Sequence, residues 1–244
     1  MRYKLYEVGG RIRDQFLGLK SKDVDYSVVI ESHMSSIEKG LWDFQAQLVS
    51  EGFEIFLVTP ECFTIRAKFP KNHKYSGVAD FVLARKEIGY TEGTRTPICV
   101  LGTLEDDLMR RDFTVNAMAK DENGDIIDLF NGKADIYFRI LDTPTDPMKS
   151  FNDDPLRIIR AMRFAVTKGF VLSERVKLAI KELGVQGLEK VSVERVRDEL
   201  YKCLKHDTRA TLRYLDFLRD DLNFDLEKYA FEGTGLWLEP TNKG

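Results

Sequence analysis

The chain has 244 residues, 43% of them hydrophobic and 32% charged, so we expect a globular protein of one or two domains with a hydrophobic core. Its formal net charge of −3 argues against a global attraction to nucleic acid, although it leaves room for a local basic patch. The cysteines are odd in number and lack a CxxC pair, which disfavours disulfides and zinc ribbons and indicates buried or idle thiols: Cys62, Cys99 and Cys203. A charged N-terminal region without a long apolar run predicts a cytoplasmic protein with no membrane partner.

The first stretch of the chain predicts a strand, a glycine turn and a short helix. Residues 3–8 have strand character, Gly9 and Gly10 form the turn, and a helix is expected over 11–17. Free backbone N–H groups at such a turn suit a phosphate, and Arg13 is close enough to add a charged fork. The alternative is an ordinary tight turn without a ligand.

The next strand, over 24–30, begins with two aspartates that share one face. Asp23 and Asp25 alternate with apolar residues, so their carboxylates lie on the face opposite the predicted core. Two like charges this close are unfavourable unless a cation lies between them, and hard oxygen ligands favour Mg²⁺. A solvent-exposed strand end is the alternative interpretation.

The pattern up to about residue 140 alternates strands with helices and predicts a mixed α+β domain. One helix is expected over 35–50, and Asp80 on a later strand could complete a metal site or be an exposed strand residue. The polar stretch 86–98, rich in glycine and threonine, predicts a mobile loop. The further strands are expected at 53–58, 62–69, 78–84 and 125–129.

Residues 104–119, "LEDDLMRRDFTVNAMA", combine core candidates with a polar cluster. Near a triphosphate, arginines suit phosphate oxygens and an aspartate suits a sugar hydroxyl; a solvated helix face is the alternative. The core candidates are Leu104, Leu108, Phe113 and Val115, and the polar cluster is Arg110, Arg111, Asp112 and Asn116.

Beyond about residue 143 the strands are expected to stop and an all-helical part to begin, with helices over 153–168, 173–183, 192–205 and 208–219. The first of these has Asp153 or Asp154 as its N-cap, Pro155 at its first position and a buried stripe of Ile158, Ala161, Met162 and Ala165. An aspartate that caps the helix and arginines that are exposed along it are one interpretation of this segment. In the other, Asp154 and Arg157 present an acceptor beside a donor. This pairing would accept cytosine and adenine and reject uracil and guanine, whose donors and acceptors are reversed.

In this order and spacing, the stretches "YEVGGRIRDQFLG", "KDVDYSVV", "LEDDLMRRDFTVNAMA" and "DDPLRIIRAMRFA" resemble the class II tRNA nucleotidyltransferase and bacterial poly(A) polymerase family. The resemblance covers most of residues 3–205. It implies a polymerase-β-like nucleotidyltransferase palm, the head domain over 1–142, followed by a helical neck and shortened body over 143–244.

The resemblance also implies roles for single residues. Gly10 and Arg13 would hold the triphosphate, and Asp23 and Asp25 the two Mg²⁺ ions. The remaining implied contacts are Arg111 and Asp112 for the ribose, Asp154 and Arg157 as the amino-acid template, and Arg160 and Arg163 beside it.

The sequence departs from the family pattern in three places. The template motif begins Asp153-Asp154 where the family usually has Glu-Asp, which retains the contacting aspartate. Family members commonly continue through helical domains that grip tRNA, whereas this sequence ends at Gly244 and suggests a compact member. A basic, aromatic run typical of poly(A) polymerases is missing from 53–85, which favours CCA or partial-CCA addition.

The resulting hypothesis is template-independent transfer of C and A nucleotides from CTP and ATP to the 3′ end of tRNA. One Mg²⁺ would activate the RNA 3′-hydroxyl, and the other would stabilise the leaving pyrophosphate. The first alternative is a poly(A) or A-adding enzyme with the same site. The second is an inactive RNA-binding module, and the third is transfer to a small molecule or a protein.

Overall fold

The computed structural model describes residues 2–21, 24–31, 36–90 and 97–231. The chain divides into two compact units, which we call unit 1 (Met1–Tyr137) and unit 2 (Phe138–Gly244). In the part of the chain that the structure describes, no helix combines the length and the apolar character needed to cross a membrane.

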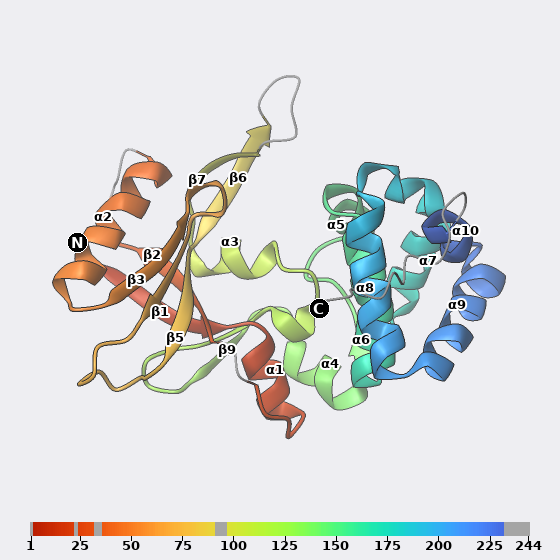
Figure 1. Cartoon of the computed structure of the whole chain (residues 1–244), viewed down its shortest axis with the longest axis horizontal. Coiled ribbons are helices and arrows are strands. Elements are labelled where there is room, and N and C mark those ends of the chain that lie inside the picture. The colour runs from red at the N-terminus through yellow and green to blue at the C-terminus, as the bar shows by residue number, and fades with distance from the viewer. Residues whose placement is uncertain (1, 22–23, 32–35, 91–96, 232–244) are drawn as a thin grey trace, which may run out of the picture. The chain divides into compact units, whose positions relative to one another are not determined.

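Unit 1 is built on a seven-stranded mixed sheet with the strand order β3-β4-β5-β2-β1-β8-β9 (Figure 1). Strands β2 and β5 pair in parallel, and the other neighbouring strands pair antiparallel. The strands are β1 Tyr3–Val8, β2 Asp25–Ile30, β3 Glu54–Thr59, β4 Thr64–Lys68, β5 Val78–Leu83, β8 Met118–Lys120 and β9 Ile126–Asp128. The predicted α+β class is therefore confirmed.

The helices of unit 1 are α1 Gly10–Phe16, α2 Ile37–Ser50, α3 Leu104–Met109 and α4 Gly132–Phe138, with short 3₁₀ turns at Pro60–Cys62 and Thr114–Asn116. Helix α2 begins after Ser36, whose side chain accepts a hydrogen bond from the backbone N–H of Lys39 at 3.2 Å. Ser36 therefore supplies the N-cap that the first turn needs.

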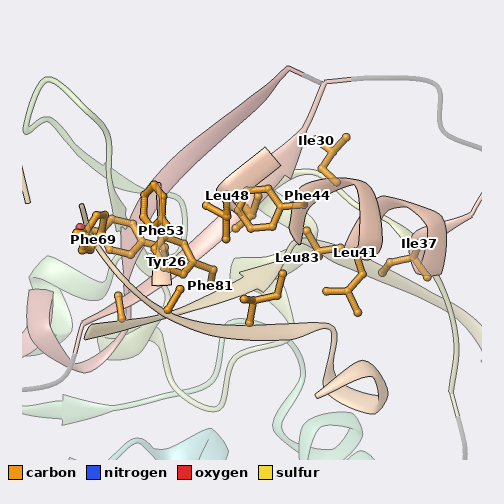
Figure 2. Packing of buried hydrophobic residues seen from close by; sticks show 14 residues of the cluster. Tyr26, Ile30, Ile37, Leu41, Phe44, Leu48, Phe53, Phe69, Phe81 and Leu83 are labelled. Atoms are coloured by element: carbon orange, nitrogen blue, oxygen red, sulfur yellow. The ribbon is translucent and has the colours of Figure 1, made fainter. Parts of the chain in front are cut away.

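The main core of unit 1 lies between α2 and one face of the sheet. Figure 2 shows the apolar stripe of α2, including Leu41, Phe44 and Leu48, beside residues from the strands. From the sheet, Tyr26 and Phe81 stack with ring centroids 5.4 Å apart. Because side chains alternate along a strand, this packing commits every second residue of β2 and β5 to the core and leaves the rest on the opposite face.

The sequence predicts a mobile loop over 86–98, and this prediction is wrong at both ends of the range, which form strands. Strand β6 Arg85–Tyr90 pairs antiparallel with strand β7 Pro97–Leu101, with an irregularity between Glu87 and Gly89; residues 91–96 lie outside the described residues. Glycine and threonine are typical of loops, so the composition did not indicate strand pairing. A β-bulge accommodates Gly89 without ending the strand.

Unit 2 consists mainly of helices with their own buried core. Helix α6 packs against α8 and α5 against α7. The helices are α5 Pro147–Asp153, α6 Leu156–Lys168, α7 Glu174–Leu183, α8 Val193–His206, α9 Thr208–Leu222 and α10 Leu226–Phe231, with a 3₁₀ segment at Val185–Lys190. The predicted helical region after the sheet is confirmed.

Three details of unit 2 differ from expectation. The strands do not stop near residue 143, because β10 Ile140–Leu141 pairs in parallel with β11 Val171–Leu172. The helix predicted over 153–168 begins slightly later, because α6 starts at Leu156 with Pro155 as its N-cap, and an unpredicted helix, α5, precedes it. On α6, Ala165 is only half-buried, whereas Phe164 belongs to the buried face.

Candidate functional site

Two aspartates predicted as metal ligands lie side by side on the face of the sheet opposite the main core. Asp25 on β2 and Asp80 on β5 are register partners in a parallel pair, so their side chains share one face. Both residues are half-buried. Asp23, the third predicted carboxylate, lies outside the described residues.

Asp80 also has a basic neighbour. Arg66 on β4 is its register partner on the other side, and the Arg66 Nε atom lies 3.1 Å from Asp80 Oδ1. Arg66, Asp80 and Asp25 therefore form a transverse row across three strands. The guanidinium offsets part of the repulsion between the two carboxylates.

This pair of carboxylates fits a magnesium site in chemical type. Mg²⁺ prefers oxygen ligands and usually takes one or two protein carboxylates, completing its shell with water and phosphate oxygens. Asp25 and Asp80 supply such oxygens on adjacent strands. No group of three metal-binding side chains occurs among the described residues, a set that does not include Asp23.

The glycine turn lies directly beside Asp25. Val8, the last residue of β1, is the register partner of Asp25, and Gly9 follows it with a φ of 80°. A Cβ atom on Gly9 would lie 3.6 Å from Asp25 Oδ2 and 3.2 Å from the Nη1 atom of Arg111. The structure therefore brings together three elements that the sequence predicted for one site: the glycine turn, a carboxylate and an arginine.

Arg13 is the centre of a buried hydrogen-bond chain. Its Nη1 atom donates to Asn116 Oδ1, and Asn116 Nδ2 donates to Asp112 Oδ1 at 2.9 Å. Its Nη2 atom also bonds Asp14 Oδ1 at 2.8 Å. Arg13 thus ties α1 to the segment that follows α3, and its role as a phosphate fork stays a prediction.

The adjacent arginines share a carboxylate that the sequence analysis missed. Asp107 on α3 is completely buried and accepts hydrogen bonds from Arg110 Nη2 at 2.6 Å and from Arg111 Nη2 at 2.9 Å. The signal was the spacing of three and four residues in "EDDLMRR", which places a carboxylate and two guanidiniums on one side of a helix end. The alternative of a freely solvated arginine face is therefore wrong.

The predicted template residues lie at the start of α6 in unit 2. Asp154 Oδ1 accepts a hydrogen bond from the backbone N–H of Leu156 at 3.3 Å. The predicted N-cap at Asp153 or Asp154 is nevertheless wrong, because Pro155 occupies the N-cap position of α6 and Asp154 is the C-cap of α5. Arg157 Nη1 donates to Ser150 Oγ of α5 at 2.7 Å. The carboxylate of Asp154 is thus bonded to the start of α6, and the guanidinium of Arg157 is bonded to α5.

Arg160 and Arg163 follow along the same helix. Both guanidiniums lie over the ring of Phe164, at 6.0 Å and 4.8 Å from its centroid. Arg163 Nε is 2.5 Å from Glu199 Oε2 on α8, so this arginine also links the two helices. Burial raises the pKa of Glu199, but Lys202 and Arg163 outweigh it and hold the pKa below its usual value.

Family comparisons assign both parts of the chain. Residues 5–142 match the family described as the poly A polymerase head domain. Residues 169–216 match a family described as a probable RNA and SrmB-binding site of polymerase A. The chain is 36% identical over 224 residues to the multifunctional CCA protein of Pseudoalteromonas atlantica, which covers 89% of this chain and 49% of that protein.

Solved structures give the same assignment. The CCA-adding enzyme of Bacillus stearothermophilus in complex with CTP is 30% identical with a TM-score of 0.70, over 92% of this chain and 49% of that one. The Thermotoga maritima CCA-adding enzyme complexed with tRNA is 26% identical with a TM-score of 0.69, over 96% and 50%. The chain thus spans about half the length of the relatives that it matches. The chain belongs to the family of CCA-adding enzymes and poly(A) polymerases that share the poly A polymerase head domain.

Proposed function

We propose that this protein is an RNA nucleotidyltransferase that adds C and A from CTP and ATP to the 3′ end of tRNA. The observation that carries the proposal is the convergence of Gly9, Asp25 and Arg111 in unit 1, with Asp80 in register beside Asp25. Relatives that resemble the chain over most of its length are CCA-adding enzymes, in one case with CTP bound and in another with tRNA.

The proposal assigns the chemistry to a head domain over 1–142. Asp25 and Asp80, together with Asp23, would hold two Mg²⁺ ions, which supply charge neutralisation at the reacting phosphate when bound. Gly9 and Gly10 leave room for a triphosphate because neither carries a side chain. Arg111, held above Gly9, would contact the incoming nucleotide, and Asp112, oriented through Asn116, would accept from its ribose.

The helical region over 143–244 would select the base. Asp154 offers a carboxylate and Arg157 a guanidinium fixed by Ser150, a pair that matches the donor and acceptor edges of cytosine and adenine. Arg160 and Arg163 would extend this contact. Cys62, Cys99 and Cys203 form no disulfide among the described residues, which agrees with a cytoplasmic reaction.

The test is incorporation of labelled nucleotide into tRNA transcripts that lack the CCA end, end in CC or carry it complete. The transcripts are incubated with Mg²⁺ and each nucleoside triphosphate alone or together, and products are resolved on a sequencing gel. We expect C and then A to be added, with no further extension of the complete end.

Two variants separate the parts of the proposal. Asp25→Asn should lower incorporation of both nucleotides by about a thousandfold, since it removes a metal-binding carboxylate. Arg157→Ala should retain incorporation but lose the preference for C and A. A wild-type chain that adds only A, once or repeatedly, would replace the proposal with the A-adding alternative, and RNA binding without nucleotide consumption would leave an inactive binding module.

A further inference from the structure

Asp107 combines complete burial with two cationic partners. Its Oδ1 atom accepts from Arg110 and its Oδ2 atom from Arg111, so both oxygens are used. Burial by itself raises the pKa of Asp107, but the charges and hydrogen bonds of the two arginines outweigh it and hold the pKa below its usual range. The carboxylate is therefore ionised at neutral pH.

The charges in this cluster do not cancel. One carboxylate faces two guanidiniums, which leaves an excess positive charge at the end of α3. Burial lowers the pKa of Arg110, and the neighbouring charges of Arg85 and Arg111 lower it further against the opposing effect of Asp107. Within this triad of Asp107, Arg110 and Arg111, one guanidinium charge is not balanced by Asp107, and an anionic ligand would balance it.

The two terminal nitrogen atoms of the Arg111 guanidinium have different neighbours. Its Nη2 atom is bound to Asp107, while its Nη1 atom lies 3.2 Å from the position that a Cβ on Gly9 would take. Its buried Nε has no hydrogen-bond acceptor among the described residues. Asp107 thus binds the Nη2 side of the Arg111 guanidinium, and the Nη1 side lies toward Gly9 and Asp25.

We propose that Asp107 is a positioning residue that orients Arg111 toward a nucleoside triphosphate at the Gly9–Gly10 turn. The inference rests on the proposed function, since it deepens the nucleotide site of that reaction. A purely structural role, in which Asp107 only closes the end of α3, is the competing explanation. The two differ in whether nucleotide affinity depends on the carboxylate beyond its effect on stability.

The chain supplies a matched control on the same helix. Asp106 caps α3 by accepting from the backbone N–H and the hydroxyl of Thr103, both at 2.8 Å. Its carboxylate bonds Thr103 and not Arg110 or Arg111, whose partner is Asp107. Asp106→Asn therefore perturbs the helix without removing the contact to Arg111, whereas Asp107→Asn removes the charge that holds it.

The experiment measures equilibrium binding of CTP and ATP with Mg²⁺ to the full chain and its variants, together with their urea unfolding. We expect Asp107→Asn to weaken nucleotide binding about tenfold and Asp106→Asn to change it less than about twofold. Arg111→Lys should weaken binding to a similar extent. The double variant Asp107→Asn/Arg111→Lys should bind no more weakly than either single variant, since both lose the same oriented guanidinium.

The outcomes are distinct. Wild-type affinity in a less stable Asp107→Asn protein, or additive losses in the double variant, would overturn the positioning role while leaving the proposed function intact. A wild-type chain that binds no nucleotide would overturn both. If Asp107→Asn does not fold, Asp107→Glu keeps the charge but shifts it by a methylene group, and unchanged affinity in that variant would contradict the proposal.

Discussion

At Gly9, both the backbone conformation and the surrounding side chains favour glycine. Its φ of 80° is strained for any side chain, and a Cβ would crowd the Nη1 atom of Arg111 at 3.2 Å. We expect Gly9→Ala to lower the free energy of unfolding by about 1–2 kcal/mol and to weaken nucleotide binding. Chemical denaturation and nucleotide titration measure the two effects.

Gly18 provides the control for this substitution. Its φ of 71° carries a similar backbone strain, but a Cβ there would meet no atom within 4 Å. Gly18→Ala should therefore show the loss of stability without the loss of nucleotide affinity. Equal losses of nucleotide affinity in the two variants would contradict the role of Gly9 in nucleotide binding.

The cysteines differ in accessibility. Cys62 is exposed, whereas Cys203 is buried, and burial raises the pKa of its thiol to about 12. We expect Cys62 to react with a disulfide reagent within minutes and Cys203 to react only on unfolding. Peptide mapping after timed labelling checks the order, and rapid labelling of Cys203 in the native protein would contradict it.

At the level of elements, the contact between α6 and α8 depends on pH. Glu199 is buried and binds both Arg163 and Lys202, and its pKa is held below the ordinary value of 4.5. A lowered pKa means that the pair stabilises the fold above that value and is lost as pH falls through the folded-state pKa.

Glu199→Gln tests this dependence. At pH 7 the variant should lose about 1–2 kcal/mol of unfolding free energy, because a charge-assisted pair is replaced by a neutral one. As pH falls through the lowered pKa of Glu199, the difference from the wild type should shrink, since Glu199 becomes protonated. Urea unfolding at several pH values measures both, and a difference that grows toward acid pH would refute the assignment.

The elements themselves followed from the sequence to different degrees. Strands β1, β2 and β5 were predicted because their alternation of apolar and polar residues matches a sheet with one buried face. The β6–β7 pair was missed because its composition is that of a loop, and because its partners, such as Arg85 and Leu101, are separated along the chain. Helix α5 was missed, although Asp146 as its N-cap and Pro147 in its first turn are residues typical of a helix start.

Across the whole molecule, the candidate site was predictable where motifs are local and not where contacts are distant. The glycine turn and Asp25 could be assigned from neighbouring residues. Arg66 and Asp107 could not, because their roles depend on strand order and on how the chain leaves α3. The role of Arg13 as a buried link to Asn116 likewise needed the fold.

The two units have separate cores, so we expect separate responses to core substitutions. Phe44 is fully buried against the sheet of unit 1, and Leu200 is fully buried in unit 2. Phe44→Ala should cost about 3–5 kcal/mol in unit 1 and shift one calorimetric transition, while Leu200→Ala should shift the other. A single transition that moves equally in both variants would contradict this expectation.

The strand register that forms the row of Arg66, Asp80 and Asp25 also determines which residues are buried in the core. The same pairing that sets these side chains together places Tyr26 opposite Phe81 in the core. A slip of β5 by one residue would send Asp80 inward and turn Phe81 outward, because side chains alternate. We therefore expect a chain misaligned in this way to lack the pair of neighbouring carboxylates that the proposed function requires.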